Sequence, residues 1–175
     1  MAMNSATRTV RITDPDAPDL QMTLEVPSQW SSPDLPEDLP PEVRAVLTDG
    51  GELTQGFATN VVVVTQALPA GTDLGRWQRG ALDQQLSSLP DVQILEDRQT
   101  DAAEPTWYRA RVTTGEGPAT LLVREWSRIV AGRGMTLTLT TVPPVDAAHG
   151  ELLDAVAASW RTTQQSVPPT PEENE

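Results

Sequence analysis

The sequence predicts an α+β domain built around a mainly antiparallel sheet. Residues 20–26 alternate between apolar and polar side chains, as a strand with one buried face does. Four more strand-like segments follow in series between residues 91 and 142, separated by short turn-like joins. Two segments with helical periodicity, 72–89 and 145–161, lie on either side of this series. Strands and helices in separate runs favour an α+β fold over a regularly alternating α/β fold.

The first strands are expected to form a hairpin. Residues 7–13 can pair with 20–26 across an Asp- and Pro-rich turn, and Trp30 follows as an apolar anchor. Residues 56–68 contain four consecutive Val. Because Val is β-branched, this run predicts a central strand that is covered on both faces.

Residues 72–89 predict an amphipathic helix. Thr72 or Asp73 can cap its N-terminus and Pro90 ends it. The expected apolar face, with Gln85 as its polar exception, consists of Leu74, Trp77, Ala81, Leu82, Gln85, Leu86 and Leu89.

The segments 91–99, 105–114, 118–131 and 134–142 predict an antiparallel meander, and 145–161 predicts a second amphipathic helix. Pro143 and Pro144 precede this helix, and Asp146 lies in its first turn. Its expected buried face comprises Val145, Ala148, Leu152, Leu153, Val156 and Trp160.

Side-chain alternation suggests a register for the meander. A turn at 115–118 with Thr114 opposite Ala119 places Arg109 opposite Arg124 and Trp107 opposite Trp126. A three-residue loop at 132–134 then keeps Leu137 away from the Arg side chains, whereas a two-residue loop would mix Leu with Arg. The resulting candidate binding face comprises Trp107, Arg109, Arg111, Arg124, Trp126 and Arg128, together with Thr136, Thr138 and Thr140.

This Arg/Trp face is a hypothesis for a binding surface. Residues 105–133 hold five Arg against two Glu, and Trp and Arg are enriched in interface hot spots. Like charges facing each other across a ladder are destabilising, so an anion is expected near Arg109 and Arg124. It belongs either to the acidic, Pro-rich residues 33–42 of this chain or to a partner.

Composition excludes several functions. The chain has 175 residues, no Cys, one His and a net charge of −13, and all 12 basic residues are Arg. The lack of Cys and Lys excludes disulfides, thiolate nucleophiles, Schiff-base chemistry and a P-loop lysine. A single His argues against multi-His metal sites, and the acidity argues against nucleic-acid binding. No cofactor is expected.

The chain is expected to form one domain over residues 1–161, followed by a disordered acidic tail at 162–175. Within the domain, residues 27–52 form an acidic, Pro-rich segment that should be rich in loops. Pro168, Pro169 and Pro171 leave open that the tail is a recognition motif. We find neither a signal peptide nor a transmembrane stretch, so the sequence predicts a cytoplasmic protein, with export by a signal-peptide-independent system as an alternative.

Catalytic and metal sites receive little support. Glu96, Asp97, Asp101 and Glu104 cluster near a turn, where acids usually face solvent, and His149 has no assignable nucleophile. Asp14, Asp16 and Asp19 lack the Gly and final Glu of an EF-hand. No enzymatic activity is expected.

The order of motifs resembles a known family. A strand ending in Val26 and Pro27 is followed by Trp30, then by the Asn60–Val63 strand, a helix and the step Leu89–Val92, before the meander and the last helix. This order resembles the LpqN-type lipoproteins of actinobacteria, within the Mog/PsbP-like superfamily, over roughly residues 7–162. The Arg-only composition also suits a GC-rich actinobacterial genome. Unlike those lipoproteins, this chain has no lipobox Cys.

The resemblance implies an α/β/α sandwich around an antiparallel sheet and a non-enzymatic accessory role linked to the cell envelope or to secretion. The expected function is therefore a protein-interaction module that uses the Arg/Trp face. The alternative is a protein that binds a small amphipathic or anionic ligand, such as a lipid or metabolite, between sheet and helix.

Overall fold

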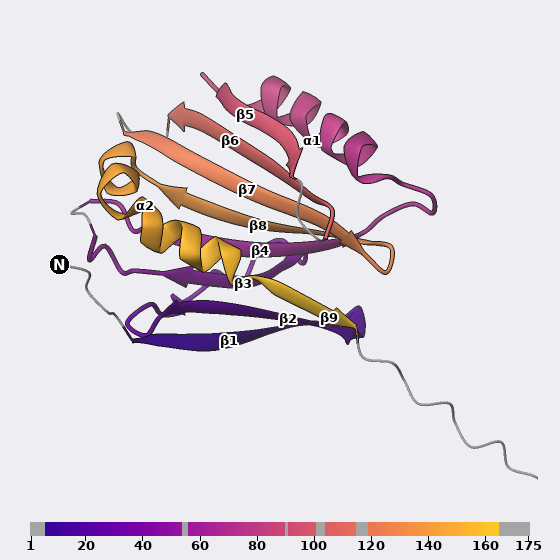
Figure 1. Cartoon of the computed structure of the whole chain (residues 1–175), viewed down its shortest axis with the longest axis horizontal. Helices are drawn as coiled ribbons and strands as arrows, with labels where there is room; N and C mark the ends of the chain where they lie inside the picture. Colours follow the sequence, from indigo (N-terminus) through magenta and orange to yellow (C-terminus); the bar gives the residue numbers. More distant parts are fainter. Residues whose placement is uncertain (1–5, 54–55, 90, 101–103, 115–118, 165–175) are drawn as a thin grey trace, which may run out of the picture.

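The computed structural model describes residues 6–53, 56–89, 91–100, 104–114 and 119–164. The expected α+β class with antiparallel sheets is confirmed (Figure 1). The strands form a three-stranded sheet of order β1-β2-β9 and a six-stranded sheet of order β3-β4-β8-β7-β6-β5. The elements are β1 (Thr7–Asp14), β2 (Ala17–Pro27), β3 (Val43–Thr48), β4 (Asn60–Ala67), α1 (Leu74–Ser88), β5 (Gln93–Thr100), β6 (Thr106–Thr114), β7 (Thr120–Val130), β8 (Arg133–Thr141), α2 (Pro143–Ala158) and β9 (Arg161–Gln164).

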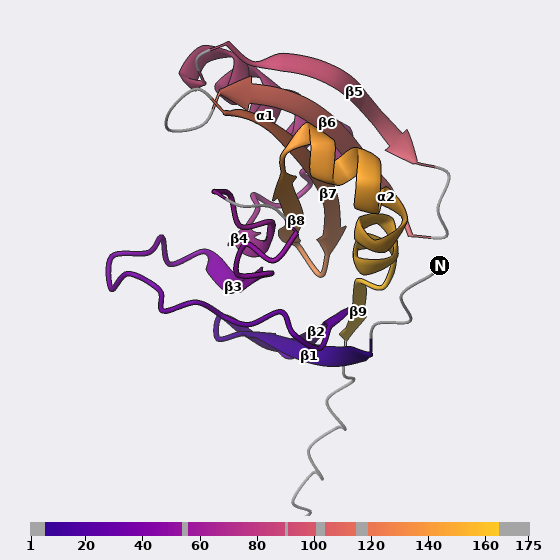
Figure 2. The same ribbon diagram turned by 90° about the vertical axis from the view of Figure 1, so that its left-hand side faces the viewer.

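The six-stranded sheet separates two layers. Helix α1 packs on one face, called here the outer face, over β6 and β7. The other face, called here the inner face, curves around α2 and the three-stranded sheet (Figure 2). The layer expected to hold only a helix therefore also holds a small sheet.

The core lies between the inner face and the three-stranded sheet. The predicted alternation in β2 is confirmed, since Leu20, Met22, Leu24 and Val26 are all buried. They pack with inward side chains of the larger sheet and with α2 in one apolar cluster. Trp30 is only 1% exposed, as expected of an anchor.

The Val run in β4 is covered more fully on one face than on the other. Val61 and Val63 point inward and are fully buried. Val62 and Val64 point outward and are only half-buried, because α1 packs over β6 and β7. The prediction of a strand covered on both faces is therefore correct only for the inner face.

Helix α1 has the predicted cap but buries a polar residue. Asp73 caps it through a hydrogen bond from the Arg76 amide, as predicted. The expected apolar face is wrong in detail: the buried residue of this helix is Gln78, and Leu86 is 52% exposed.

Helix α2 begins earlier and ends earlier than predicted. Pro143 lies in its first turn, and the backbone leaves helical geometry at His149. Val145, Leu153 and Val156 are buried as expected, whereas Ala148 is exposed. Trp160 is fully buried but follows the end of the helix.

Two strands contradict the sequence prediction. β3 lies inside the acidic, Pro-rich segment 27–52, where loops were expected, and it pairs with β4. β9 includes Thr162–Gln164, which were assigned to the tail, and it pairs with β2. A four-residue strand carries too little alternation to be recognised from sequence. Pro90, Asp101, the turn 115–118 and residues 165–175 lie outside the described residues.

A buried carboxylate joins the two sheets. Asp14, at the end of β1, is fully buried and forms ion pairs with Arg44 of β3 (2.9 Å) and Arg133 of β8 (2.6 Å). It also accepts a hydrogen bond from Thr65 Oγ1 in β4 (2.7 Å). Asp14, considered above as a calcium ligand, thus already forms ion pairs and a hydrogen bond with these groups.

The pKa of Asp14 reflects this setting. Burial by itself would raise its pKa, but the hydrogen bonds from Thr65 and from the Asp16 amide, with the charges of Arg44 and Arg133, lower it below the ordinary value. Such a carboxylate stabilises the folded protein fully at pH values above its unfolded-state pKa. This stabilisation is lost as the pH falls through the lower, folded-state pKa.

We predict that Asp14→Asn lowers the unfolding free energy by about 3 kcal/mol at neutral pH, because it leaves buried Arg charges poorly compensated. Wild-type stability should decline below about pH 4, and the variant should lack part of that decline. Urea unfolding from neutral pH to about pH 2 measures both effects. Asp16→Asn is the matched control, since Asp16 meets the same Arg pair but its side chain is 66% exposed. Equal losses in the two variants would contradict the assignment.

Close packing at Gly134 fixes the Trp77 ring. A Cβ at Gly134 would lie 2.7 Å from the Trp77 ring and 3.1 Å from Leu68. Gly134→Ala should therefore displace Trp77 and lower the unfolding free energy by about 1–3 kcal/mol.

Gly80→Ala on α1 is the control for this prediction. A Cβ at Gly80 meets no described atom within 4 Å. This helical substitution should raise stability by about 0.5–1 kcal/mol in the same denaturation assay. A Gly134→Ala protein as stable as Gly80→Ala would show that Trp77 is not packed as described.

Candidate functional site

The observed register differs from the predicted one by one residue between β6 and β7 and by three residues between β7 and β8. Arg109 lies opposite Glu125 instead of Arg124, and Trp107 lies opposite Ser127 instead of Trp126. Between β7 and β8, Val130 pairs with Arg133, so the loop has two residues and not three. Its two residues, Ala131 and Gly132, both have positive φ, as a type I′ turn requires.

This shift divides the predicted Arg/Trp face between the two faces of the sheet. Trp107, Arg109 and Arg111 lie on the outer face with Ser127 and Glu125, and the strand pairing extends this face to Thr136, Thr138 and Thr140. Arg124, Trp126 and Arg128 lie on the inner face, opposite Leu139, Leu137 and Met135. The mixture of Leu with Arg that seemed unfavourable from the sequence is therefore present.

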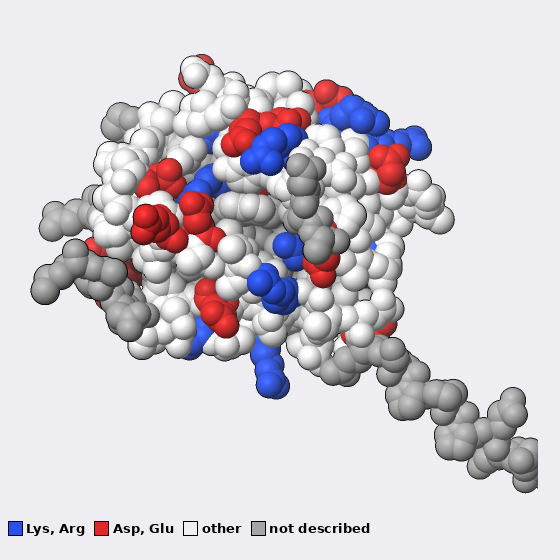
Figure 3. All heavy atoms as spheres, in the orientation of Figure 1, with Lys and Arg blue, Asp and Glu red and all other residues white. Residues whose placement is uncertain are grey.

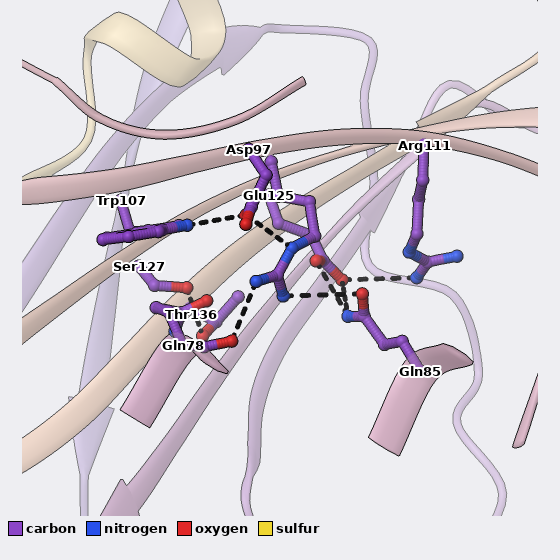
Figure 4. Close-up of polar contacts among 9 residues, drawn as sticks. Gln78, Gln85, Asp97, Trp107, Arg111, Glu125, Ser127 and Thr136 are labelled. Atoms are coloured by element: carbon purple, nitrogen blue, oxygen red, sulfur yellow. Dashed lines mark hydrogen bonds and ion pairs between the residues drawn. The ribbon is translucent and has the colours of Figure 1, made fainter. Parts of the chain in front are cut away.

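Arg109 is the centre of a polar cluster beneath α1 (Figure 4). Its side chain is 1% exposed, and its Nε donates to Asp97 Oδ1 at 2.8 Å. Its Nη2 donates to the Gln78 carbonyl of α1 at 2.9 Å. The Trp107 indole donates to the same Asp97 oxygen at 2.7 Å.

Glu125 completes this outer cluster. It accepts hydrogen bonds from Gln85 of α1 (3.0 Å) and from Arg111 (3.2 Å). The anion expected near Arg109 is thus supplied from within the chain, by Asp97 and, through Gln85, by Glu125. Removing one member of such a buried set lowers the stability of the folded protein by far more than the intact set adds to it, because an uncompensated charge is left. The cluster therefore holds α1 to the sheet.

The inner-face Arg side chains have their own acidic partners. Arg124 forms ion pairs with Asp154 (2.5 Å) and Asp146 (3.1 Å), both on α2. Arg128 pairs with Glu104 (3.0 Å) and stacks over Trp160, with 4.6 Å between the guanidinium carbon and the ring centroid. Burial lowers the pKa of Arg128, and the charge of Glu104 opposes this shift.

Two aromatic side chains lie next to each other on the inner face, near these ion pairs. Tyr108 and Trp126 are both half-buried, and their ring centroids are 5.3 Å apart. Arg98 lies over Tyr108 and Arg124 over Trp126, at 5.6 and 5.7 Å from the ring centroids. Figure 3 shows a recessed area beside α2 with blue and red side chains around it. We call Tyr108, Trp126, Arg98, Arg124 and Arg128 the aromatic hollow.

The hollow contains both charged and unsatisfied groups. Burial raises the pKa of Tyr108 above its ordinary value, although the charge of Arg124 opposes the rise. The buried Nε of Arg124 has no hydrogen-bond acceptor among the described residues. Sequence reasoning missed Tyr108 because the assumed register placed it among the apolar positions.

Residues 33–42 do not supply the acids of either cluster. These acids come from Asp97, Glu125, Asp146, Asp154 and Glu104. Instead, the segment leads into β3, where the Pro41 carbonyl accepts from Arg44 and the Glu42 carbonyl accepts from the Thr65 amide. Its Leu35 is 42% exposed.

A separate groove runs beside α1 on the outer side. It has a volume of about 520 Å³ and lies between the helix and the chain that follows β4. A second cavity of about 450 Å³, lined by Arg44 and Arg133, adjoins it at Gln66 and Ala67. We call the first cavity the α1 groove; its lining includes Leu68, Pro69, Arg76, Trp77, Gly80 and Ala81.

The acids considered for catalysis are engaged in ion pairs. Glu96 pairs with Arg98, Asp97 with Arg109, and Glu104 with Arg128. His149 lies at the kink of α2. Within the described parts of the chain, no three His, Asp or Glu side chains gather as metal ligands would, and neither helix is long and apolar enough to span a membrane.

Sequence comparison identifies no relative. No family model matches the chain, and no curated protein matches it.

Comparison of structures does find proteins with a similar fold. The solution structure of cyanobacterial PsbP (CyanoP) from Synechocystis sp. PCC 6803 matches with a TM-score of 0.65 and 15% identity, over 93% of this chain and 95% of that one. LpqN of Mycobacterium tuberculosis matches with a TM-score of 0.61 and 13% identity, over 90% and 91%. The protein of unknown function PA94 from Pseudomonas aeruginosa matches with a TM-score of 0.59 and 13% identity, over 93% and 99%. With its two helices and antiparallel sheets, this chain has a PsbP-like fold.

Proposed function

We propose that this chain is a non-enzymatic accessory protein that binds another protein through the aromatic hollow. The observation that carries the proposal is the Tyr108–Trp126 pair, which is half-buried and has Arg98 over one ring and Arg124 over the other. Tyr, Trp and Arg are the residues that most often dominate the binding energy of protein interfaces.

The charge balance of the hollow suits a partner that is not itself highly charged. Each rim Arg already has at least one acidic neighbour, namely Glu96, Asp154 or Glu104. Most of the binding energy would therefore come from a partner that covers the aromatic rings, with the ion pairs forming a polar rim around them.

The same ion pairs argue for a non-enzymatic role. Carboxylates that act as general acid or base require a raised pKa or access to substrate. Glu96, Asp97 and Glu104 are instead engaged in ion pairs with Arg side chains.

The fold supports an accessory role linked to the cell envelope or to secretion. LpqN, which shares this fold, is described as involved in cell envelope biogenesis. Together with the order of sequence motifs, this leads us to propose an actinobacterial LpqN-type protein. Of the residues first considered for binding, Arg124, Trp126 and Arg128 would contact the partner, whereas Trp107, Arg109 and Arg111 lie on the opposite face of the sheet and have no role in partner binding.

Trp126→Leu should weaken binding of the partner by about 30-fold, the effect of losing one hot-spot side chain. Gly150→Trp should also weaken it: Gly150 lies one turn from both Asp146 and Asp154, and its Cβ would meet no described atom within 4 Å. Partners recovered with wild-type bait from the native source would be purified, and their Kd values measured for each variant.

Two variants serve as controls. Trp107→Leu changes the same residue type on the neighbouring strand but on the outer face, and Gly80→Trp adds the same bulk on α1. Circular dichroism confirms that each variant is folded. Equal Kd values for Trp126→Leu, Gly150→Trp and wild type would refute the hollow as the binding surface.

A further inference from the structure

We propose that the α1 groove binds a small amphipathic molecule with a single anionic group. This site goes beyond the proposed function, since it lies on the outer side of the six-stranded sheet and shares no residue with the aromatic hollow. Its volume of about 520 Å³ is in the range of small-molecule pockets, which is about 300–1,000 Å³.

One wall of the groove is apolar and preformed, and Gln66, Thr72 and Gln84 add polar surface to the rest of the lining. The Trp77 ring packs on Gly134 and Leu68 and is thereby fixed in position. Pro69 and Ala81 add apolar surface. Gly80 leaves the helix side open, because no described atom lies within 4 Å of the place where its Cβ would be. An aliphatic chain could therefore lie along the indole without displacing any side chain.

Arg76 supplies the charge. It is the one charged residue in the lining of the α1 groove, it is exposed, and no acidic group among the described residues forms an ion pair with it. The adjoining cavity differs, because Arg44 and Arg133 are neutralised there by Asp14 and Asp16. One uncompensated cation beside an apolar wall matches a ligand with one anionic head and one apolar tail.

The adjoining cavity has a different charge balance. The two cavities have Gln66 and Ala67 in common in their linings. The cancelled charges of that second cavity offer no further anion site. A ligand with two anionic groups would therefore gain little over one with a single anionic group.

Isothermal titration calorimetry with decanoate tests this proposal on the full chain. We expect about one site, and we expect decyltrimethylammonium, which has the same tail and the opposite charge, to bind at least tenfold more weakly. Arg76→Gln should weaken the binding of decanoate about tenfold. Arg79→Gln should leave the Kd for decanoate unchanged, since Arg79 is exposed on the same helix but outside the groove lining.

Steric variants locate the site. Gly80→Trp should abolish decanoate binding by filling the groove, whereas Gly150→Trp on the inner side should leave it unchanged. In NMR spectra, decanoate should shift the indole resonance of Trp77 in the wild type.

Four results would each overturn the proposal: no binding of decanoate in the millimolar range, equal affinity for the cationic analogue, an unchanged Kd in Arg76→Gln, or an unchanged Kd in Gly80→Trp. None of these results bears on the aromatic hollow, so failure here and failure of the proposed function are distinguishable.

Discussion

The organisation of this protein depends on the register of β6, β7 and β8. A two-residue turn at Ala131 and Gly132 sets Val130 against Arg133, and the pairing that follows places alternate side chains of β7 on opposite faces. Because the side-chain period of a strand is two, a shift of one residue would exchange the contents of the two faces. The pairing of β6 with β7, which sets Arg109 opposite Glu125 and not opposite Arg124, separates the two Arg groups of the meander.

Each face then compensates its Arg side chains with acids from another element. On the outer face, Asp97 and Glu125 surround Arg109, and α1 adds Gln78 and Gln85. On the inner face, α2 supplies Asp146 and Asp154 to Arg124. Polar and ionic contacts thus position both helices against the sheet, while the apolar core lies mainly between the sheets and α2. The same arrangement leaves Tyr108 and Trp126 partly uncovered.

Much of the fold could be predicted from the sequence, because periodicity reports burial directly. The alternation in β2, the meander and both helices were recognisable in this way. The register could not be predicted, for two reasons. Ala-Gly is an uncommon sequence for a type I′ turn. The burial argument also assumed that Arg124 and Arg128 avoid the face of the sheet that holds Leu137. That assumption failed because acids from α2 and Glu104, distant in sequence, neutralise them. The α1 groove depends on the close approach of Trp77 to Gly134, for which we find no periodic signal in the sequence.

Engineered disulfides test the register most directly, since the chain has no native Cys. The hydroxyl oxygens of Ser127 and Thr136 lie 3.0 Å apart on directly opposed residues, so the pair Ser127→Cys and Thr136→Cys should form a disulfide on mild oxidation. Arg128→Cys with Thr138→Cys, which the sequence-based register would place opposite each other, should keep free thiols because the two residues point to opposite faces. Thiol titration and mass spectrometry would measure both. A disulfide in the second pair and none in the first would contradict the account.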